Sequence, residues 1–261
     1  MDETTQSFED YIAELIHICE EEPDVIGLVL FGSTADRSRM DEWSDHDFAV
    51  VTRSGAQSRL RGDLRWLPRC EELVLSVQER HGGFKAVYED GHVIEFAVVD
   101  SEELREFHAN AYRVAYGRSD VAEIMAEVAA RPKALAETDD AKSIRIFLAL
   151  LLIGCGRARR GEALSAGQTI RSEALDHLLP VLAHRLGGSG VDRLDSLDAR
   201  RRFESVFPEA GATLTAALER SPETCARALL ELSCQQLQDG WDDYPAAAAD
   251  VVRRRLGWSV S

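Results

Sequence analysis

Apolar positions recur at helical spacing near the start of the chain. Ser7 followed by Asp10 resembles a capping box, in which side chains satisfy the free amides of a first helical turn. Pro23 lacks the backbone N–H that a helix interior needs. Between them, the apolar positions fall three or four residues apart: Phe8, Tyr11, Ile12, Leu15, Ile16 and Cys19. The pattern predicts an amphipathic helix that begins near Ser7 and ends before Pro23.

Residues 25–31 form a short apolar run with β-branched members, and residues 47–52 form the next strand-like segment. Runs of this kind are typical of strands that are buried on both faces. Residues 60–81 instead show helical spacing, with a new start at Pro68, and Gly82-Gly83 closes the segment. The pattern therefore predicts two strands followed by a helical segment.

A hairpin is indicated by Asp90-Gly91, which lies between the strand-like runs 84–89 and 92–99. Asp-Gly favours a tight two-residue turn between antiparallel strands. A two-residue loop would place Ala86 opposite Glu95. This register is an expectation that depends on the length of the turn.

After Asp100 the patterning is almost all helical, and no further strand is expected. The polar, proline-containing stretch from Arg131-Pro132 to Asp139-Asp140 is the best candidate for a domain boundary. The chain is therefore expected to be an α+β protein. A mixed sheet with helices would occupy residues 1–130, and a helical bundle would occupy residues 131–261.

Composition and charge narrow the class of protein. Hydrophobic residues make up 45% of the chain and charged residues 29%, which is ordinary for a globular protein. The formal net charge is −16, and the first 120 residues carry 26 acidic against 12 basic residues. This balance disfavours a partner with a phosphate backbone, so no nucleic-acid binding is expected. The acidic first half would suit a cationic ligand or metal ions, or it is a solvated surface.

The five cysteines are scattered and form no CxxC pair, so neither a zinc site nor a disulfide framework is indicated. The longest apolar run, residues 146–155, is about half of a membrane span. The first residues lack the basic and apolar regions of a signal peptide. A cytoplasmic protein without a membrane partner is expected, as a monomer or homodimer.

The most informative chemistry lies at Asp45 and Asp47. Residues two apart on a strand point to the same face, so both carboxylates would project together. Two adjacent carboxylates repel unless a cation neutralises them, and Mg²⁺ prefers oxygen ligands. The alternative is a polar strand end whose aspartates cap nearby backbone amides.

Gly32-Ser33 ends the first predicted strand and opens into a polar turn. A glycine at such a position lets backbone amides approach a phosphate group closely. The alternative is a simple tight turn, and a Walker P-loop is excluded because no Gly-Lys-Ser/Thr follows. Together with Asp45 and Asp47, the turn is typical of a site for a nucleoside triphosphate with Mg²⁺.

A third acid, Glu95, interrupts an otherwise apolar predicted strand. An unpaired buried carboxylate is costly, so it needs a partner or a role. Glu95 would bind a metal ion or accept the proton of an attacking hydroxyl. The alternative is a glutamate at a strand edge that forms a salt bridge.

The order Phe-Gly-Ser, eleven residues, Asp45-His46-Asp47 and a later strand acid resembles the DNA polymerase β-like nucleotidyltransferase superfamily. Within it, the chain is similar to the small nucleotidyltransferases that modify aminoglycoside or lincosamide antibiotics. The motif match spans residues 28–100. The resemblance implies a nucleotidyltransferase domain over residues 1–130 and a helical acceptor-binding domain over residues 131–261.

The resemblance also implies roles for individual residues. Gly32 and Ser33 would hold the β- and γ-phosphates. Asp45, Asp47 and Glu95 would be the catalytic carboxylates and the Mg²⁺ ligands, with Glu95 either a third ligand or the general base. Two cations are weaker candidates for the nucleotide: Arg37 in the turn, and Lys142 at the start of a helix in the second half. His46 between the aspartates would face the opposite side of the sheet and serve packing or local hydrogen bonding.

The expected activity is Mg²⁺-dependent transfer of AMP from ATP to a hydroxyl group of a small acceptor, possible acceptors being an aminoglycoside or a lincosamide. One alternative is adenylylation of a protein partner, as in toxin–antitoxin pairs. Another is a nucleotide-binding regulatory module without catalysis. The intact Gly32-Ser33, Asp45, Asp47 and Glu95 favour an enzyme.

Overall fold

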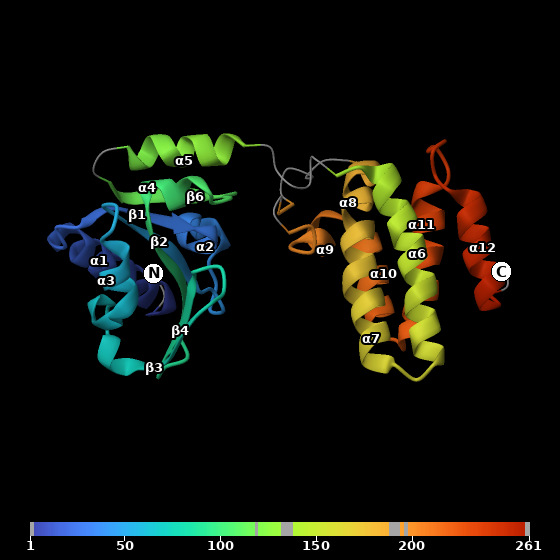
Figure 1. Ribbon diagram of the computed structural model, residues 1–261, viewed down its shortest axis with the longest axis horizontal. Helices are drawn as coiled ribbons and strands as arrows, with labels where there is room; N and C mark the ends of the chain where they lie inside the picture. The colour runs from blue at the N-terminus through green and yellow to red at the C-terminus, as the bar shows by residue number, and fades with distance from the viewer. Residues whose placement is uncertain (1–2, 118–119, 132–137, 188–193, 196–197, 259–261) are drawn as a thin grey trace. The chain divides into compact units, whose positions relative to one another are not determined.

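The computed structural model describes residues 3–117, 120–131, 138–187, 194–195 and 198–258 (Figure 1). The chain separates into two compact units, Met1–Arg131 and Pro132–Ser261. The first contains a mixed sheet with helices, and the second contains helices and no strand among its described residues. The α+β class expected from the sequence is confirmed.

The sheet of the first unit has six strands in the order β3-β4-β5-β2-β1-β6. Neighbouring strands are antiparallel except for β2 and β5, which are parallel. The strands are β1 (Val25–Phe31), β2 (His46–Thr52), β3 (Leu73–Gln78), β4 (Phe84–Tyr88), β5 (Val93–Asp100) and β6 (Tyr112–Gly117). The two buried runs recognised in the sequence, β1 and β2, are therefore central strands.

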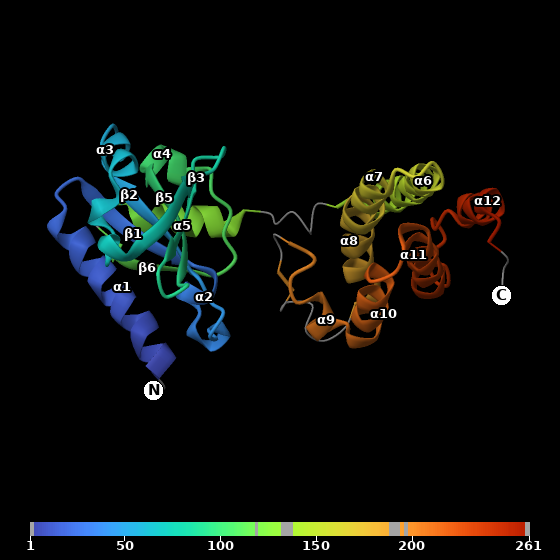
Figure 2. The same ribbon diagram turned by 90° about the horizontal axis from the view of Figure 1, so that it is seen from below.

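Helices cover both faces of this sheet (Figures 1 and 2). They are α1 (Glu3–Glu21), α2 (Gly32–Ala35), α3 (Gln57–Gly62), α4 (Ser101–Arg105) and α5 (Val121–Ala130). Helices α1 and α3 pack on one face, called the α1 face below, where Leu15 and Leu60 join its core. Helices α4 and α5 pack on the other, the α5 face, with Leu104 and Ile124.

Alternation along each strand decides which residues belong to which face. In β2, Phe48 and Val50 enter the core of the α1 face, whereas Ala49 and Val51 enter that of the α5 face. Helix α5 approaches the sheet closely at Gly27, because a Cβ atom there would lie 2.8 Å from Val121 Cγ2. The same alternation assigns His46 to the α1 face and Asp47 to the α5 face.

The prediction of a helical segment over residues 60–81 is wrong. Helix α3 ends at Gly62, 3₁₀ turns follow at Leu64–Trp66 and Cys70–Glu72, and Leu73–Gln78 forms strand β3. β3 lies at the sheet edge, where Val74, Leu75 and Val77 are each at least half exposed. Over so short a run, the apolar residues fit the helical and the strand periodicity equally well. The segment is a strand because it pairs with β4.

Two other expectations also fail. Tyr112–Gly117 forms strand β6, which pairs with β1, although no strand was expected after Asp100. Helix α1 begins at Glu3, so Ser7 lies within the helix and is not its N-terminal cap. The end of the helix before Pro23 is confirmed.

The hairpin is present, but its register differs from the prediction by one residue. The Tyr88 amide donates to the His92 carbonyl at 2.9 Å, so three residues form the loop, and Gly91 adopts a left-handed φ of +86°. Hairpins of this kind use glycine at the third loop position. As a result Lys85, not Ala86, lies opposite Glu95. A shift of one residue exchanges the side chains of the two faces.

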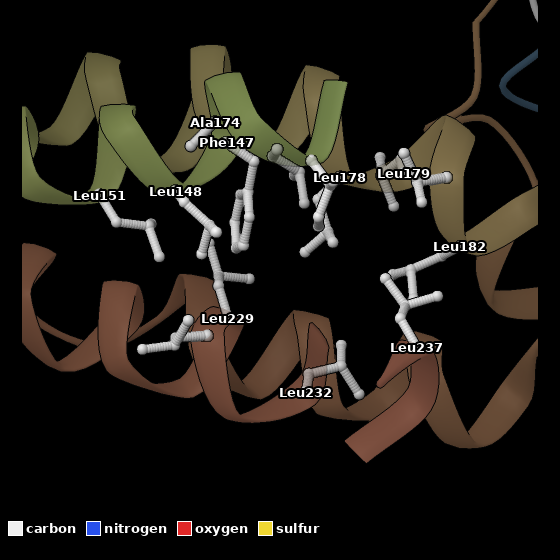
Figure 3. Close-up of a cluster of buried hydrophobic side chains, with 14 of the residues drawn as sticks. Phe147, Leu148, Leu151, Ala174, Leu178, Leu179, Leu182, Leu229, Leu232 and Leu237 are labelled. Atoms are coloured by element: carbon white, nitrogen blue, oxygen red, sulfur yellow. The ribbon is translucent and has the colours of Figure 1, made fainter. Parts of the chain in front are cut away.

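The second unit is built around the long helix α6 (Asp140–Arg159), which contains the apolar run 146–155. Figure 3 shows side chains of α6, α8 and α11 meeting in its core, including Phe147, Leu178 and Leu229. The other elements are α7 (Ala163–Gln168), a π-helical segment (Thr169–Ala174), α8 (Leu175–Leu186), α9 (Phe203–Val206), α10 (Pro208–Leu218), α11 (Pro222–Leu237) and α12 (Ala246–Leu256). Across the described residues, no helix combines the length and apolar character that crossing a bilayer requires.

Candidate active site

The two aspartates lie where the chain enters the central strand β2. Asp45 directly precedes the strand and Asp47 is its second residue. Both residues are half-buried, and both take part in further interactions within the protein. The entry to β2 is thus the first component of the site.

Thr34 holds this entry in place. It is 1% exposed and lies in the short helix α2, which follows β1. Its hydroxyl oxygen Oγ1 accepts a hydrogen bond from the Asp47 amide at 2.9 Å and donates to the Asp45 carbonyl at 3.3 Å. One buried hydroxyl therefore fixes the backbone on both sides of His46 relative to the Gly32-Ser33 turn.

Gly32 brings this turn against Asp47. Its φ of +54° lies in the left-handed region, which a residue with a Cβ atom enters at a cost. A Cβ atom at this position would lie 3.8 Å from Asp47 Oδ2. The Gly32 amide donates to the Ala111 carbonyl at 3.3 Å. A phosphate at the turn would therefore meet the amide and hydroxyl of Ser33 first.

A row of charged side chains, called the carboxylate row below, crosses the α5 face from Asp47. The parallel register pairs Asp47 of β2 with Glu95 of β5, and the antiparallel register pairs Glu95 with Lys85 of β4. The Lys85 ammonium donates to Glu95 Oε1 and lies 3.6 Å from Glu79 Oε2. The hydrogen bond to Glu95 raises the pKa of Lys85, so this ammonium stays protonated.

A cavity of about 460 Å³ lies over this part of the sheet, within the first unit. Its wall includes Asp47 and Glu95 and three more carboxylates, Glu79, Glu103 and Glu106. Arg61 also lines it, and its guanidinium donates to Glu103 at 2.7 Å. The cavity adjoins the carboxylate row and presents mainly negative charge.

On the α1 face, by contrast, His46 and His92 form a neutral pair. His46 is 1% exposed and stacks on Phe8, with 3.6 Å between ring centroids. Its Nε2 lies 3.0 Å from the Phe8 carbonyl, which can only accept, so Nε2 donates. The neutral ring then accepts at Nδ1 from His92 Nε2 at 2.6 Å. Burial lowers the pKa of His46 to about 3 and that of His92 to about 4. The structural role expected for His46 is confirmed.

Of the two cations predicted for the nucleotide, Arg37 lies in the first unit and Lys142 in the second. Arg37, in a 3₁₀ turn, forms an ion pair with Glu9 of helix α1. Lys142 belongs to the second unit and lies in the first turn of α6, where the Asp139 carboxylate caps its amide at 3.0 Å. Their assignment to the nucleotide stays a prediction.

The loop before Asp45 presents an exposed indole. Asp41 Oδ1 accepts from the Trp43 amide at 2.9 Å, and the Asp41 amide donates to the Ser44 hydroxyl at 2.9 Å. These bonds order the turn, yet the Trp43 side chain is 87% exposed. A large apolar side chain thus stands in solvent two residues from Asp45.

The donor set suits one divalent ion of the Mg²⁺ type. Mg²⁺ is commonly held by one or two carboxylates together with substrate phosphates and water. Asp45 and Asp47 supply such carboxylates, while Glu95 is held by Lys85. Over the residues that the structure describes, no group of three or more His, Cys, Asp or Glu side chains is arranged to hold a metal. The residues fit a metal ion that arrives with a nucleotide better than a preformed three-acid cage.

Sequence reasoning missed Thr34 and Lys85. Thr34 lies next to Gly32-Ser33, but its two hydrogen bonds depend on how α2 meets β2. Lys85 was assigned to a strand without a role, because the predicted register placed Ala86 opposite Glu95. A three-residue reading of the Asp90-Gly91 loop would have identified it.

No protein-family model and no curated protein matches the chain. Several solved structures are similar to it, among them the following three. An aminoglycoside 6-adenyltransferase from Bacillus subtilis is 12% identical, with 97% of this chain and 99% of that chain covered and a TM-score of 0.31. A nucleotidyltransferase-like protein from Exiguobacterium sibiricum is 15% identical, with 97% and 79% covered and a TM-score of 0.33. A STING-associated CdnE c-di-GMP synthase from Capnocytophaga granulosa is 10% identical, with 97% and 80% covered and a TM-score of 0.31. Because the TM-scores are near 0.3, assignment of the site rests on its residues.

Proposed function

We propose that this protein is a Mg²⁺-dependent nucleotidyltransferase that moves AMP from ATP to a hydroxyl group of a small acceptor. The observation that carries the proposal is the junction of the Gly32-Ser33 turn with the entry of β2. There Asp47 Oδ2 lies against Gly32, and Thr34 fixes the backbone at Asp45 and Asp47. The resemblance of these motifs to polymerase β-like nucleotidyltransferases supports the same reading.

Each group would have one task in the reaction. Ser33 would donate hydrogen bonds to the terminal phosphates, and Asp45 and Asp47 would hold the ion that accompanies them. Mg²⁺, when bound, would supply the positive charge that the triphosphate and the developing pyrophosphate need. The acceptor oxygen forms a bond to the α-phosphorus while the bond to the β-phosphate oxygen breaks, and pyrophosphate leaves. Glu95 would accept the proton of the attacking hydroxyl.

The acceptor class follows from the cavity beside Glu95. Carboxylates of Glu79, Glu103 and Glu106 line it with one guanidinium, Arg61, and a mainly negative cavity concentrates cationic ligands. A cationic, hydroxylated small molecule such as an aminoglycoside suits it better than a lincosamide, which carries fewer amino groups. We further propose that the helical part, residues 131–261, contributes to acceptor binding.

The test is pyrophosphate release from Mg²⁺-ATP over a panel of aminoglycosides, lincosamides and uncharged polyols, with Asp47→Ala as the control. Release with the cationic compounds, lost in the variant, is the expected result. Release that persists in Asp47→Ala would contradict the assignment of the site. No release with any compound, despite binding of Mg²⁺-ATP, would redirect the search to a protein acceptor or a regulatory role.

A further inference from the structure

The carboxylate row on the α5 face ends in a resident cation. Neighbouring strands lie about 5 Å apart, so paired residues on β5 and β4 bring their side chains within reach of each other. In this register the ammonium of Lys85 contacts Glu95 Oε1 and lies 3.6 Å from Glu79 Oε2. The third acid of the proposed site is thus already neutralised by the protein itself.

Stability does not account for this ion pair. The side chains of Lys85 and Glu95 are 40% and 42% exposed, and ion pairs as exposed as this contribute little to folding. Lys85 is also the single lysine of residues 1–131, which otherwise carry arginine as their basic residue. Lysine presents a compact point charge, whereas arginine presents a planar fork. A compact cation in contact with a carboxylate can occupy the position that a metal ion would otherwise take.

We propose that Lys85 takes the place of a second divalent cation, so that the site binds one metal ion per nucleotide and not two. The inference rests on the proposed function. Lys85 is a positioning residue here, because it acts through Glu95. In two-metal enzymes a second ion lies beside the first at about 3.5–4 Å and shares its ligands. A second ion at Glu95 would have to displace the ammonium and then lie close to it.

The local charges agree with this assignment. Glu95 carries one negative charge, which Lys85 balances through direct contact. The same reasoning explains why the described carboxylates form no three-ligand cluster, since Glu95 is directed to Lys85.

The inference is tested by counting Mn²⁺ ions bound to the full chain with a saturating, non-transferable ATP analogue (α,β-methylene-ATP), using electron paramagnetic resonance. The wild type and Lys85→Arg should each bind one ion, and Lys85→Met should bind two. The double variant Lys85→Met/Glu95→Gln should return to one, because Glu95 would be the ligand of the additional ion. Arg65→Met, which removes a cation from an exposed ion pair with Asp63, is the matched control and should bind one ion. Circular dichroism checks that each variant is folded.

Two ions in the wild type, or one ion in Lys85→Met, would overturn the inference. Neither result would touch the proposed function, which requires only that metal and nucleotide bind at Asp45 and Asp47. A wild type that binds neither Mn²⁺ nor the analogue would instead contradict the proposed function, and the inference with it.

Discussion

The two faces of the first unit's sheet differ in the burial and the charge of their polar residues. His46 and Asp47 are consecutive in β2, yet one is sealed under helix α1 and the other is half-buried in the carboxylate row. His46 has partners for both ring nitrogens and a pKa lowered to about 3. Asp47 stands beside Glu95, and their negative charges are set side by side by the register.

The difference separates groups that build the fold from groups that meet a ligand. A buried polar group is tolerated when its hydrogen bonds are complete and it is uncharged. Like charges in register oppose folding unless something cationic joins them. The histidine pair is therefore a structural element, and the carboxylate row is the site that we propose. Substitutions on the two faces should separate stability from activity.

The largest effect is expected for Asp47→Asn. The substitution keeps the shape of the side chain and removes the charge that would hold the metal ion, so turnover should fall about 1,000-fold, the upper range for loss of one electrostatic group at an active site. The melting temperature should change little. Pyrophosphate release and thermal unfolding measure the two quantities, with Asp63→Asn as a surface control. A large loss of stability would place Asp47 among the structural residues.

The opposite pattern is expected for His46→Ala. It removes a buried ring that stacks on Phe8 and leaves the Phe8 carbonyl without its donor. The free energy of unfolding should fall by about 3 kcal/mol, as for other buried aromatic side chains. Denaturant unfolding measures this loss. Activity of the folded fraction at low temperature should be close to that of the wild type. A selective loss of turnover would contradict the assignment of stability to the α1 face and activity to the α5 face.

Acid should weaken the α1 face, where the histidine pair is held neutral. Unfolded histidine has a pKa of about 6.5, whereas the folded values are about 3 for His46 and about 4 for His92. Between these values the unfolded chain binds more protons, so the stability present above pH 6.5 is lost as the pH falls towards 4. The loss should be about 2 kcal/mol for each of the two histidines from pH 7 to pH 5.

Denaturant unfolding over this pH range is the measurement. The double variant His46→Phe/His92→Phe should show a flatter pH dependence than the wild type. His17→Ala, at a histidine whose side chain is 67% exposed, is the matched control and should leave the slope unchanged. An unchanged slope in the double variant would show that other groups carry the acid response.

The smallest effect is expected for Thr34→Val, because Thr34 both stabilises the fold and positions the proposed site. Valine keeps the shape but loses the bonds to the Asp47 amide and the Asp45 carbonyl, at a cost of about 1 kcal/mol in stability. Because both aspartates depend on this hydroxyl, the KM for Mg²⁺ should rise and turnover should fall about tenfold, equivalent to about 1.4 kcal/mol. Thr34→Ser should restore the KM and the turnover. A Thr34→Val enzyme with wild-type kinetics would show that the two hydrogen bonds of Thr34 have no role in the site.

The sequence was sufficient for elements whose signal is local. The apolar runs 25–31 and 47–52 predicted central strands because burial on both faces leaves continuous hydrophobic sequence. Edge strands lack this signal. β3 exposes most of its side chains, and β6 is half-buried, so neither run differs clearly from a helix or loop.

For the candidate site, the aspartates and Gly32 were recognisable because spacing along one strand and one turn defines them. Lys85 was not, since its place opposite Glu95 depends on whether the hairpin loop has two or three residues. Asp90-Gly91 predicts a turn but does not fix its length. Thr34 depends on contact between segments eleven and thirteen residues apart in the chain.

The exposed indole of Trp43 gives the protein an optical reporter. Trp241 is buried and Trp66 and Trp258 are partly buried, so a collisional quencher such as iodide should reach Trp43 first. Its turn is anchored by Asp41 and lies two residues before Asp45. Occupation of Asp45 and Asp47 would therefore change the fluorescence of one identifiable residue. Ligand entry can then be followed in real time without labelling, even before the natural acceptor is identified.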